Sequence, residues 1–351
     1  MVVRLLSIVL VVAALTPSAL ATRDSARSFL ANAFALTAAD LTRLDGGEVI
    51  SRTLDVTNNR EVATLGIVRI STPAATYVER LSDIVTFKRA DGVLQIGKFS
   101  HEPQLEDTDA LTIDDGDVKR LRSCRMDDCK LRLSADGISR AHREIDWQAP
   151  DASRQASRLI RQLITEYAGR YVEQGASTME YAGRVPTLNV GREFAAMLDS
   201  DRITAQYAAG LRRHLLDYPA PSADGATDFL YWSKELVRGR PVVSITHVAT
   251  VAANDDSPVA YAIGSKQIYA MHYFDASLGL TLLVPDRTTT MARTYVVYLN
   301  RSRIDLFGGL FGGTARRIVA GRARSLVADQ LQRLQAILGG QTGQAAIQKP
   351  N

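Results

Sequence analysis

Histidine is the side chain with which this chain could most readily do acid–base chemistry, and the sequence holds five histidines. Two of them fall in apolar, strand-like stretches. His247 shares a predicted strand face with Ile245, and His272 shares one with Ala270. If such a face lines a cavity, either imidazole could orient a ligand or transfer a proton. A histidine whose polar atoms are satisfied inside the core is the commoner alternative, and both interpretations stay open.

Tyr269 and Trp232 join His247 and His272 as candidate ligand-binding residues. No catalytic residue is assigned, because the sequence has neither a Gly-x-Ser-x-Gly elbow nor a His-Glu-x-x-His zinc motif. We accordingly expect no metal and no cofactor. The segment 307–314 has the glycine spacing of a phosphate-binding loop but lacks its lysine, and we interpret it as a turn.

The two cysteines, Cys124 and Cys129, lie close together in the sequence. In an oxidising compartment such a pair can close a tight loop as a disulfide. A metal site would need two more soft ligands, and a redox pair is more often Cys-x-x-Cys. We predict a structural disulfide, with free thiols as the main alternative.

The first 21 residues have the pattern of a secretory signal peptide. Arg4 supplies the positive charge, an apolar run extends from Leu5 to Leu15, and Ala19-Leu20-Ala21 has the small-x-small form of a cleavage site. An uncleaved N-terminal anchor is the alternative. We expect an exported protein, periplasmic or extracellular, without a later transmembrane segment.

Composition narrows the class of protein further. Hydrophobic residues make up 46% of the chain and charged residues 23%, which excludes a disordered chain, a collagen-like repeat and a polytopic membrane protein. The 42 basic and 38 acidic side chains nearly cancel, so no nucleic-acid partner is expected.

Alternation and helical spacing predict an α+β chain. A hairpin is expected from strands at 48–56 and 61–70, followed by a helix at 73–87 and a strand at 93–99. Helical periodicity fills 151–218. Strand patterns return, in an antiparallel meander, at 229–237, 241–252, 259–274, 279–284 and 293–303. A final helix at 314–338 has a predicted buried stripe made of Val319, Ala323, Leu326, Leu331, Leu334 and Ile337 or Leu338.

This order of elements resembles the START-like, or helix-grip, superfamily of lipid-transfer proteins and polyketide cyclases. The resemblance is topological and rests on residues 49–70, 73–87 and 242–338. It implies a curved antiparallel sheet that grips a long C-terminal helix, with an apolar cavity between them. The expected divisions are a signal peptide (1–21), the N-terminal half of the START-like domain (22–150), a helical insertion or lid (151–218), the C-terminal sheet and helix (219–338) and a disordered tail (339–351).

The function that the resemblance implies is binding of a hydrophobic small molecule or lipid in that cavity. An acid–base enzyme on the same scaffold and an envelope protein-interaction module are the alternatives. Because catalytic motifs are missing, we lean against an enzyme. Peripheral membrane contact, through a basic face of the last helix, and the oligomeric state are left open.

Overall fold

The computed structural model describes residues 25–182, 187–221, 225–254, 256–305 and 312–339. The expected signal peptide, residues 307–311 of the expected turn and the tail from residue 340 onward lie outside the described residues. Within those ranges the chain is an α+β protein with one large antiparallel sheet, as the sequence predicts.

Eight strands form this sheet in the order β1-β2-β10-β9-β8-β7-β6-β3, and every neighbouring pair is antiparallel. The strands are β1 (Ile50–Leu54), β2 (Glu61–Ile70), β3 (Val93–Lys98), β6 (Thr227–Val237), β7 (Arg240–Ala252), β8 (Tyr261–Ala270), β9 (Phe274–Asp286) and β10 (Arg293–Ile304). A separate small hairpin pairs β4 (Glu180–Tyr181) with β5 (Leu188–Asn189).

The C-terminal strands β6 to β10 form the predicted meander, because each pairs with the next along the chain. The N-terminal strands β1, β2 and β3 extend the meander at both of its edges. The β1–β2 hairpin pairs through β2 with β10, and β3 pairs with β6 at the opposite edge. The two halves of the sequence therefore build a single sheet.

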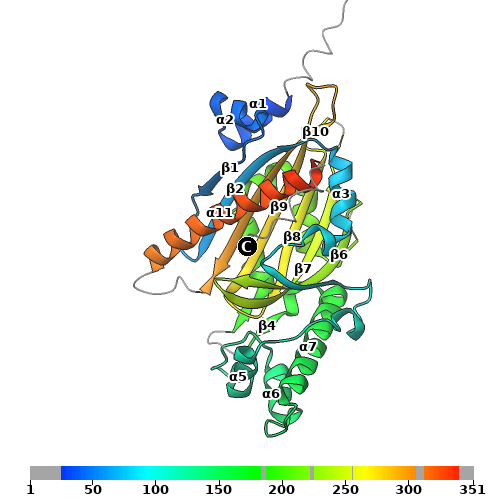
Figure 1. Ribbon diagram of the computed structural model, residues 1–351, viewed down its shortest axis with the longest axis vertical. Helices are drawn as coiled ribbons and strands as arrows, with labels where there is room; N and C mark the ends of the chain where they lie inside the picture. The colour runs from blue at the N-terminus through cyan, green and yellow to red at the C-terminus, as the bar shows by residue number, and fades with distance from the viewer. Residues whose placement is uncertain (1–24, 183–186, 222–224, 255, 306–311, 340–351) are drawn as a thin grey trace, which may run out of the picture.

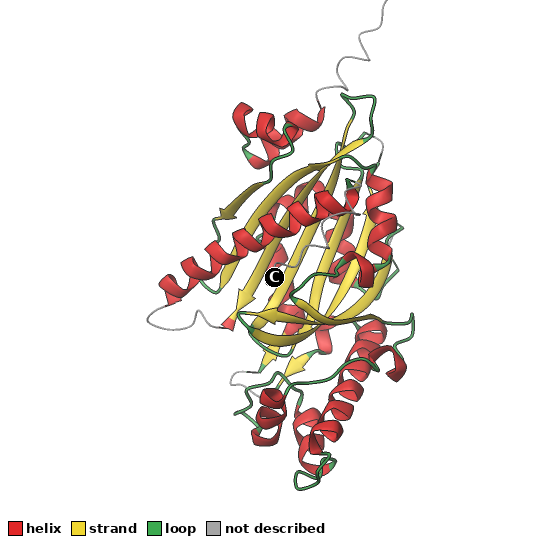
Figure 2. Cartoon of the chain, viewed as in Figure 1, coloured by secondary structure: helices red, strands yellow, loops and turns green. Residues whose placement is uncertain are grey.

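Helices cover both faces of this sheet (Figure 2). One face, here called the α11 face, packs against α3 (Ala74–Ser82), α4 (Ile84–Phe87) and α11 (Gly312–Leu338). The other, the α10 face, belongs to two larger apolar clusters. These clusters contain α1 (Ser25–Phe34), α2 (Ala38–Asp45), α5 (Asp115–Ser123), α6 (Ala135–Arg143), α7 (Ala152–Gln174), α8 (Val190–Asp199), α9 (Arg202–Tyr207) and α10 (Ala209–Asp217).

The helical segment 151–218 thus forms part of the layer behind the sheet, on the face opposite α11. Its helix α10 carries Leu211 and Leu215 on one stripe, and both are fully buried against the sheet. Gly264 on β8 permits this contact, because a Cβ atom there would lie 2.6 Å from Leu215 Cδ1. This layer is also the one that brings His214 to the sheet.

The long helix α11 crosses the sheet over β2 and β1 (Figure 1). Val327, Leu331 and Leu338 are buried on it, whereas Leu326 is 58% exposed. The predicted burial of Leu326 is therefore wrong. Apolar residues stand at both 326 and 327, so the pattern leaves the rotation of the helix ambiguous by one residue, about 100°.

The strand predicted at 259–274 is interrupted before its end. β8 ends at Ala270 and β9 begins at Phe274, with a turn between them in which Tyr273 has a φ of 64°. His272 consequently lies in this turn rather than on a strand face, which corrects the expectation. Positive φ at a tyrosine is uncommon. Because the turn contains no glycine or asparagine, the sequence does not predict a turn here.

Cys124 and Cys129 form the predicted disulfide, directly after α5. Both residues are buried in the cluster that contains α5, α6 and α7. Among the described residues, no helix has both the length and the apolar character needed to span a bilayer.

Candidate functional site

A cavity of about 230 Å³ lies between the α11 face of the sheet and the helices α3, α4 and α11. The sheet supplies its floor from β6, β8, β9 and β10, and the helices supply its walls. Its apolar lining residues are Tyr77, Leu81, Ile84, Phe87, Ala90, Val93, Tyr231, Ile263, Val296, Tyr298, Leu331, Leu334 and Ile337.

Two of the side chains that the sheet contributes to the cavity floor are small. Ser265 and Thr281 stand on neighbouring strands of the floor, while Tyr77 and Leu81 descend from α3 at helical spacing. Leu331 reaches down from α11 and closes the side near β2. The rest of the floor consists of larger side chains, among them Tyr231, Ile263 and Tyr298.

A charged pair stands among the polar residues of the lining, which also include Arg89, Ser265, Thr281, Gln330 and Arg333. Lys88 donates hydrogen bonds to Glu235 Oε1 at 3.0 Å and to the Tyr231 hydroxyl at 3.2 Å. Burial acts to raise the pKa of Glu235, but the charge of Lys88 and a hydrogen bond from Ser233 hold that pKa below its ordinary value. Burial acts in the opposite sense on Lys88, whose pKa is nevertheless raised by Tyr231 and Glu235. The pair is therefore ionised at neutral pH and can orient a polar group of a ligand.

The volume sets the size of what could enter. It exceeds the roughly 150 Å³ of cavities that hold benzene. It is smaller than the roughly 300–1,000 Å³ of sites for drug-sized ligands. A single-ring or short-chain molecule fits these limits better than a complete diacyl lipid.

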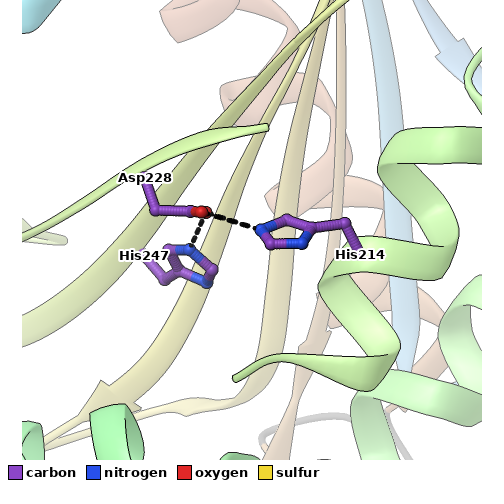
Figure 3. A group of neighbouring side chains, drawn as sticks. All are labelled: His214, Asp228 and His247. Atoms are coloured by element: carbon purple, nitrogen blue, oxygen red, sulfur yellow. Dashed lines mark hydrogen bonds and ion pairs between the residues drawn. The ribbon is translucent and has the colours of Figure 1, made fainter. Parts of the chain in front are cut away.

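A second group of functional side chains lies on the α10 face (Figure 3). His214 from α10 and His247 from β7 both point their Nε2 atoms at the carboxylate of Asp228 on β6. The His214 Nε2 atom lies 2.8 Å from Oδ1 and 2.9 Å from Oδ2, and the His247 Nε2 atom lies 2.5 Å from Oδ1. One ring nitrogen of each histidine and one carboxylate oxygen of Asp228 all lie within 4.8 Å of one another.

Aromatic side chains hold this cluster in place. The Tyr171 hydroxyl lies 2.8 Å from His247 Nδ1, and the Tyr218 ring packs against the His247 ring at 4.3 Å between centroids. Tyr218 also makes an edge contact with the His214 ring. The two imidazoles are buried, whereas the Asp228 side chain is 21% exposed and gives the cluster its access to solvent.

Burial dominates the electrostatics around these residues. It lowers the pKa of His247, and it lowers the pKa of neighbouring Lys266 to about 7. For Asp228, burial acts to raise the pKa, but hydrogen bonds and charge from His247 and His214 bring it below its ordinary value. An ionised carboxylate thus faces an imidazole that is neutral near pH 7, and chemically the cluster could share a proton or bind a cation.

The four residues singled out from the sequence all lie on the α10 side, and none is among those that line the cavity. His247 belongs to the cluster just described. The His272 Nε2 atom lies 2.9 Å from Asp117 Oδ1, where both side chains are buried. Tyr269 donates its hydroxyl to the Arg132 carbonyl, and Trp232 donates Nε1 to the Asp107 carbonyl. In the last three, the polar atoms are satisfied within the core.

Sequence reasoning missed His214 and Asp228. A usable signal exists for each. His214 is a polar residue on the apolar stripe of α10, between Leu211 and Leu215, and Asp228 alternates with Leu230 on a strand. The sequence does not show that these two residues contact His247. The contact arises because β6 pairs with β7 and because α10 packs on the same face of the sheet.

No protein-family model matches the chain, and no curated protein or solved structure matches it either.

Proposed function

We propose that this protein binds a small, mainly apolar molecule in the cavity between the sheet and α11. The observation that carries the proposal is the cavity itself, whose walls are largely apolar and contain the ion pair of Lys88 and Glu235 together with Arg89 and Arg333. Such sites bind by removing apolar ligand surface from water, at roughly 25 cal/mol per Å², while a few polar groups set orientation. The START-like resemblance of the element order supports the same function.

The ligand class follows from the lining. An aromatic ring or short alkyl chain would contact Leu81, Ile263 and Leu331, and a hydroxyl or carbonyl group would reach Lys88. Glu235 lies beside Lys88 and offsets its charge, while Arg89 and Arg333 add two further basic side chains to the lining. We therefore propose a single-ring or short-chain ligand that carries a hydrogen-bond-accepting group.

We also propose that the protein acts outside the cytoplasm, in the periplasm or beyond the cell. The signal-peptide pattern of residues 1–21 supports this, and so does the disulfide, since disulfides persist in oxidising compartments.

Native mass spectrometry and ligand-observed NMR test the binding proposal. Protein purified without denaturation is expected to carry a small molecule in part of the population, or to bind p-cresol, indole or octanol when these are added. Replacing Ser265 with Leu fills the cavity floor and should abolish binding. The matched control is Ser153→Leu, because Ser153 is exposed on α7 and away from the cavity lining.

Equal binding by Ser265→Leu and Ser153→Leu would place the ligand elsewhere. Failure of the wild-type protein both to carry a ligand and to bind any of the three probes would contradict the proposal.

A further inference from the structure

The cluster of His214, Asp228 and His247 is not used by the proposed cavity, and it combines side chains from α10, β6 and β7. Both imidazoles direct a ring nitrogen at the Asp228 carboxylate (Figure 3), and the three possible ligand atoms lie within 4.8 Å of one another. Two imidazole nitrogens and one carboxylate form the donor set that proteins use for zinc and related divalent transition metals. Calcium and magnesium, in contrast, prefer sets made of oxygen atoms.

We propose that His214, Asp228 and His247 form a binding site for one divalent transition-metal ion, for which Zn²⁺ is the first probe. A cation would take the place of the protons shared between the carboxylate and the two Nε2 atoms. The same three groups would then bind it directly.

The distances require only a small adjustment. Zinc bonds of about 2.0–2.2 Å place two tetrahedral ligands roughly 3.4 Å apart. The observed separations from Asp228 Oδ1 are 2.8 Å to His214 Nε2 and 2.5 Å to His247 Nε2. A metal ion would widen these two separations and bring the two Nε2 atoms, which lie within 4.8 Å of each other, to a similar distance. Both changes require shifts of about 1 Å in each side chain. Asp228 can move most easily, because it is the partly exposed member of the cluster.

The surroundings of His247 resemble the outer shell of a metal site. A metal-binding imidazole usually hydrogen-bonds through its other ring nitrogen, which fixes the orientation of the ring. Tyr171 provides this contact at His247 Nδ1, and the Tyr218 ring holds the imidazole from one side. With three protein ligands and solvent access at Asp228, a tetrahedral ion would keep its fourth position for water or another small ligand.

Titration calorimetry on the full chain, purified without a histidine tag and dialysed against a chelator, tests the proposal. The wild-type protein is expected to bind about one Zn²⁺ per chain. Asp228→Asn and His214→Gln should weaken that binding by roughly 100-fold or more, and Tyr171→Phe by roughly 10-fold. The control is His272→Gln, which removes a buried histidine that contacts a single carboxylate, and it should bind Zn²⁺ like the wild type.

Histidine ring NMR on the wild-type protein keeps the test independent of whether the variants fold. Adding Zn²⁺ should shift the ring nitrogens of His214 and His247 and leave those of His101, His142 and His272 unchanged. Absence of Zn²⁺ binding to the wild type would overturn the proposal. So would binding that survives Asp228→Asn and His214→Gln, or binding that shifts other histidines instead.

Discussion

The Lys88 ammonium group lies 3.0 Å from Glu235 Oε1, across the wall of the cavity from α4 to β6. Both side chains are less than one-third exposed. A hydrogen-bonded pair at this depth couples the stability of the fold to pH, because the folded state favours the charged form of both groups.

We predict that this pair stabilises the protein at neutral pH and loses its effect in acid. The pKa of Glu235 is lowered in the folded state, so its contribution is present above its ordinary pKa of 4.5 and is lost as pH falls through the folded value. Lys88, whose pKa is raised, contributes below its ordinary pKa of 10.5. Glu235→Gln should lower the free energy of unfolding by about 1–3 kcal/mol at pH 7 and flatten its decline below pH 4.5.

Urea denaturation between pH 3 and pH 8 measures this effect, because that range includes the ordinary carboxyl pKa values. Asp128→Asn is the matched control, because it removes the partner of Lys130 in an ion pair whose side chains are 78% and 74% exposed. That change should cost less than about 1 kcal/mol. If the two variants had the same pH dependence, the Lys88–Glu235 pair would not be coupled to folding.

Two leucines on α11 test how the helix faces the sheet. Leu331 is 3% exposed and Leu326 is 58% exposed. Leu331→Asp should lower the free energy of unfolding by at least about 3 kcal/mol, since it buries a carboxylate without a partner. Leu326→Asp should change it by about 0.5 kcal/mol or less. Thermal melts of both variants decide the matter, and equal melting temperatures would mean that α11 does not pack on the sheet as described.

Gly66 on β2 is predicted to be required for the close approach of α11. A Cβ atom at this position would lie 2.6 Å from Leu331 Cδ1 and would also overlap Val327. Gly66→Ala should therefore lower stability by roughly 1–3 kcal/mol, the usual cost of overfilling a core.

The control for that change lies on α11 itself. Gly321 has open space where a Cβ atom would stand, and Gly321→Ala should leave stability unchanged or raise it by roughly 0.5–1 kcal/mol. Chemical denaturation of both variants gives the comparison. A Gly66→Ala protein as stable as the wild type would show that the helix can move away at no cost.

Peptide mapping without reduction should recover Cys124 linked to Cys129 from the purified protein. The two cysteines are the only ones in the chain, so an intramolecular link leaves no thiol to react. Alkylation of both cysteines before any reductant is added would contradict the assignment.

The strands and the long helix could be predicted because their patterns are local. β2 has the predicted bounds 61–70, and β10 extends one residue beyond the predicted 293–303. The last helix begins two residues before the predicted start and ends at the predicted residue. The errors at Leu326 and His272 have local causes of a different kind, an ambiguous helical phase and a turn formed at a tyrosine. The hydrophobic periodicity determines neither the rotation of the helix at Leu326 nor the position of the turn at His272.

The sites were harder to predict because they depend on contacts between distant segments. Lys88 and Glu235 are separated by 147 residues, and His214 meets His247 only after α10 packs behind the sheet. The pattern indicates that His247 is a polar residue on an apolar strand face, but it does not name the partners of this residue. A cavity is a still less local property, since it depends on which side chains fail to fill a space.

Methyl NMR on the wild-type protein tests ligand binding in the cavity most directly. Ile84, Ile263 and Leu331 line the cavity, whereas Ile203 belongs to the helices behind the sheet. On titration with p-cresol, indole or octanol, binding in the cavity predicts saturable shifts of the first three methyl signals and none at Ile203. Shifts at Ile203 alone, or no saturable shift at any cavity methyl with any of these molecules, would contradict the account.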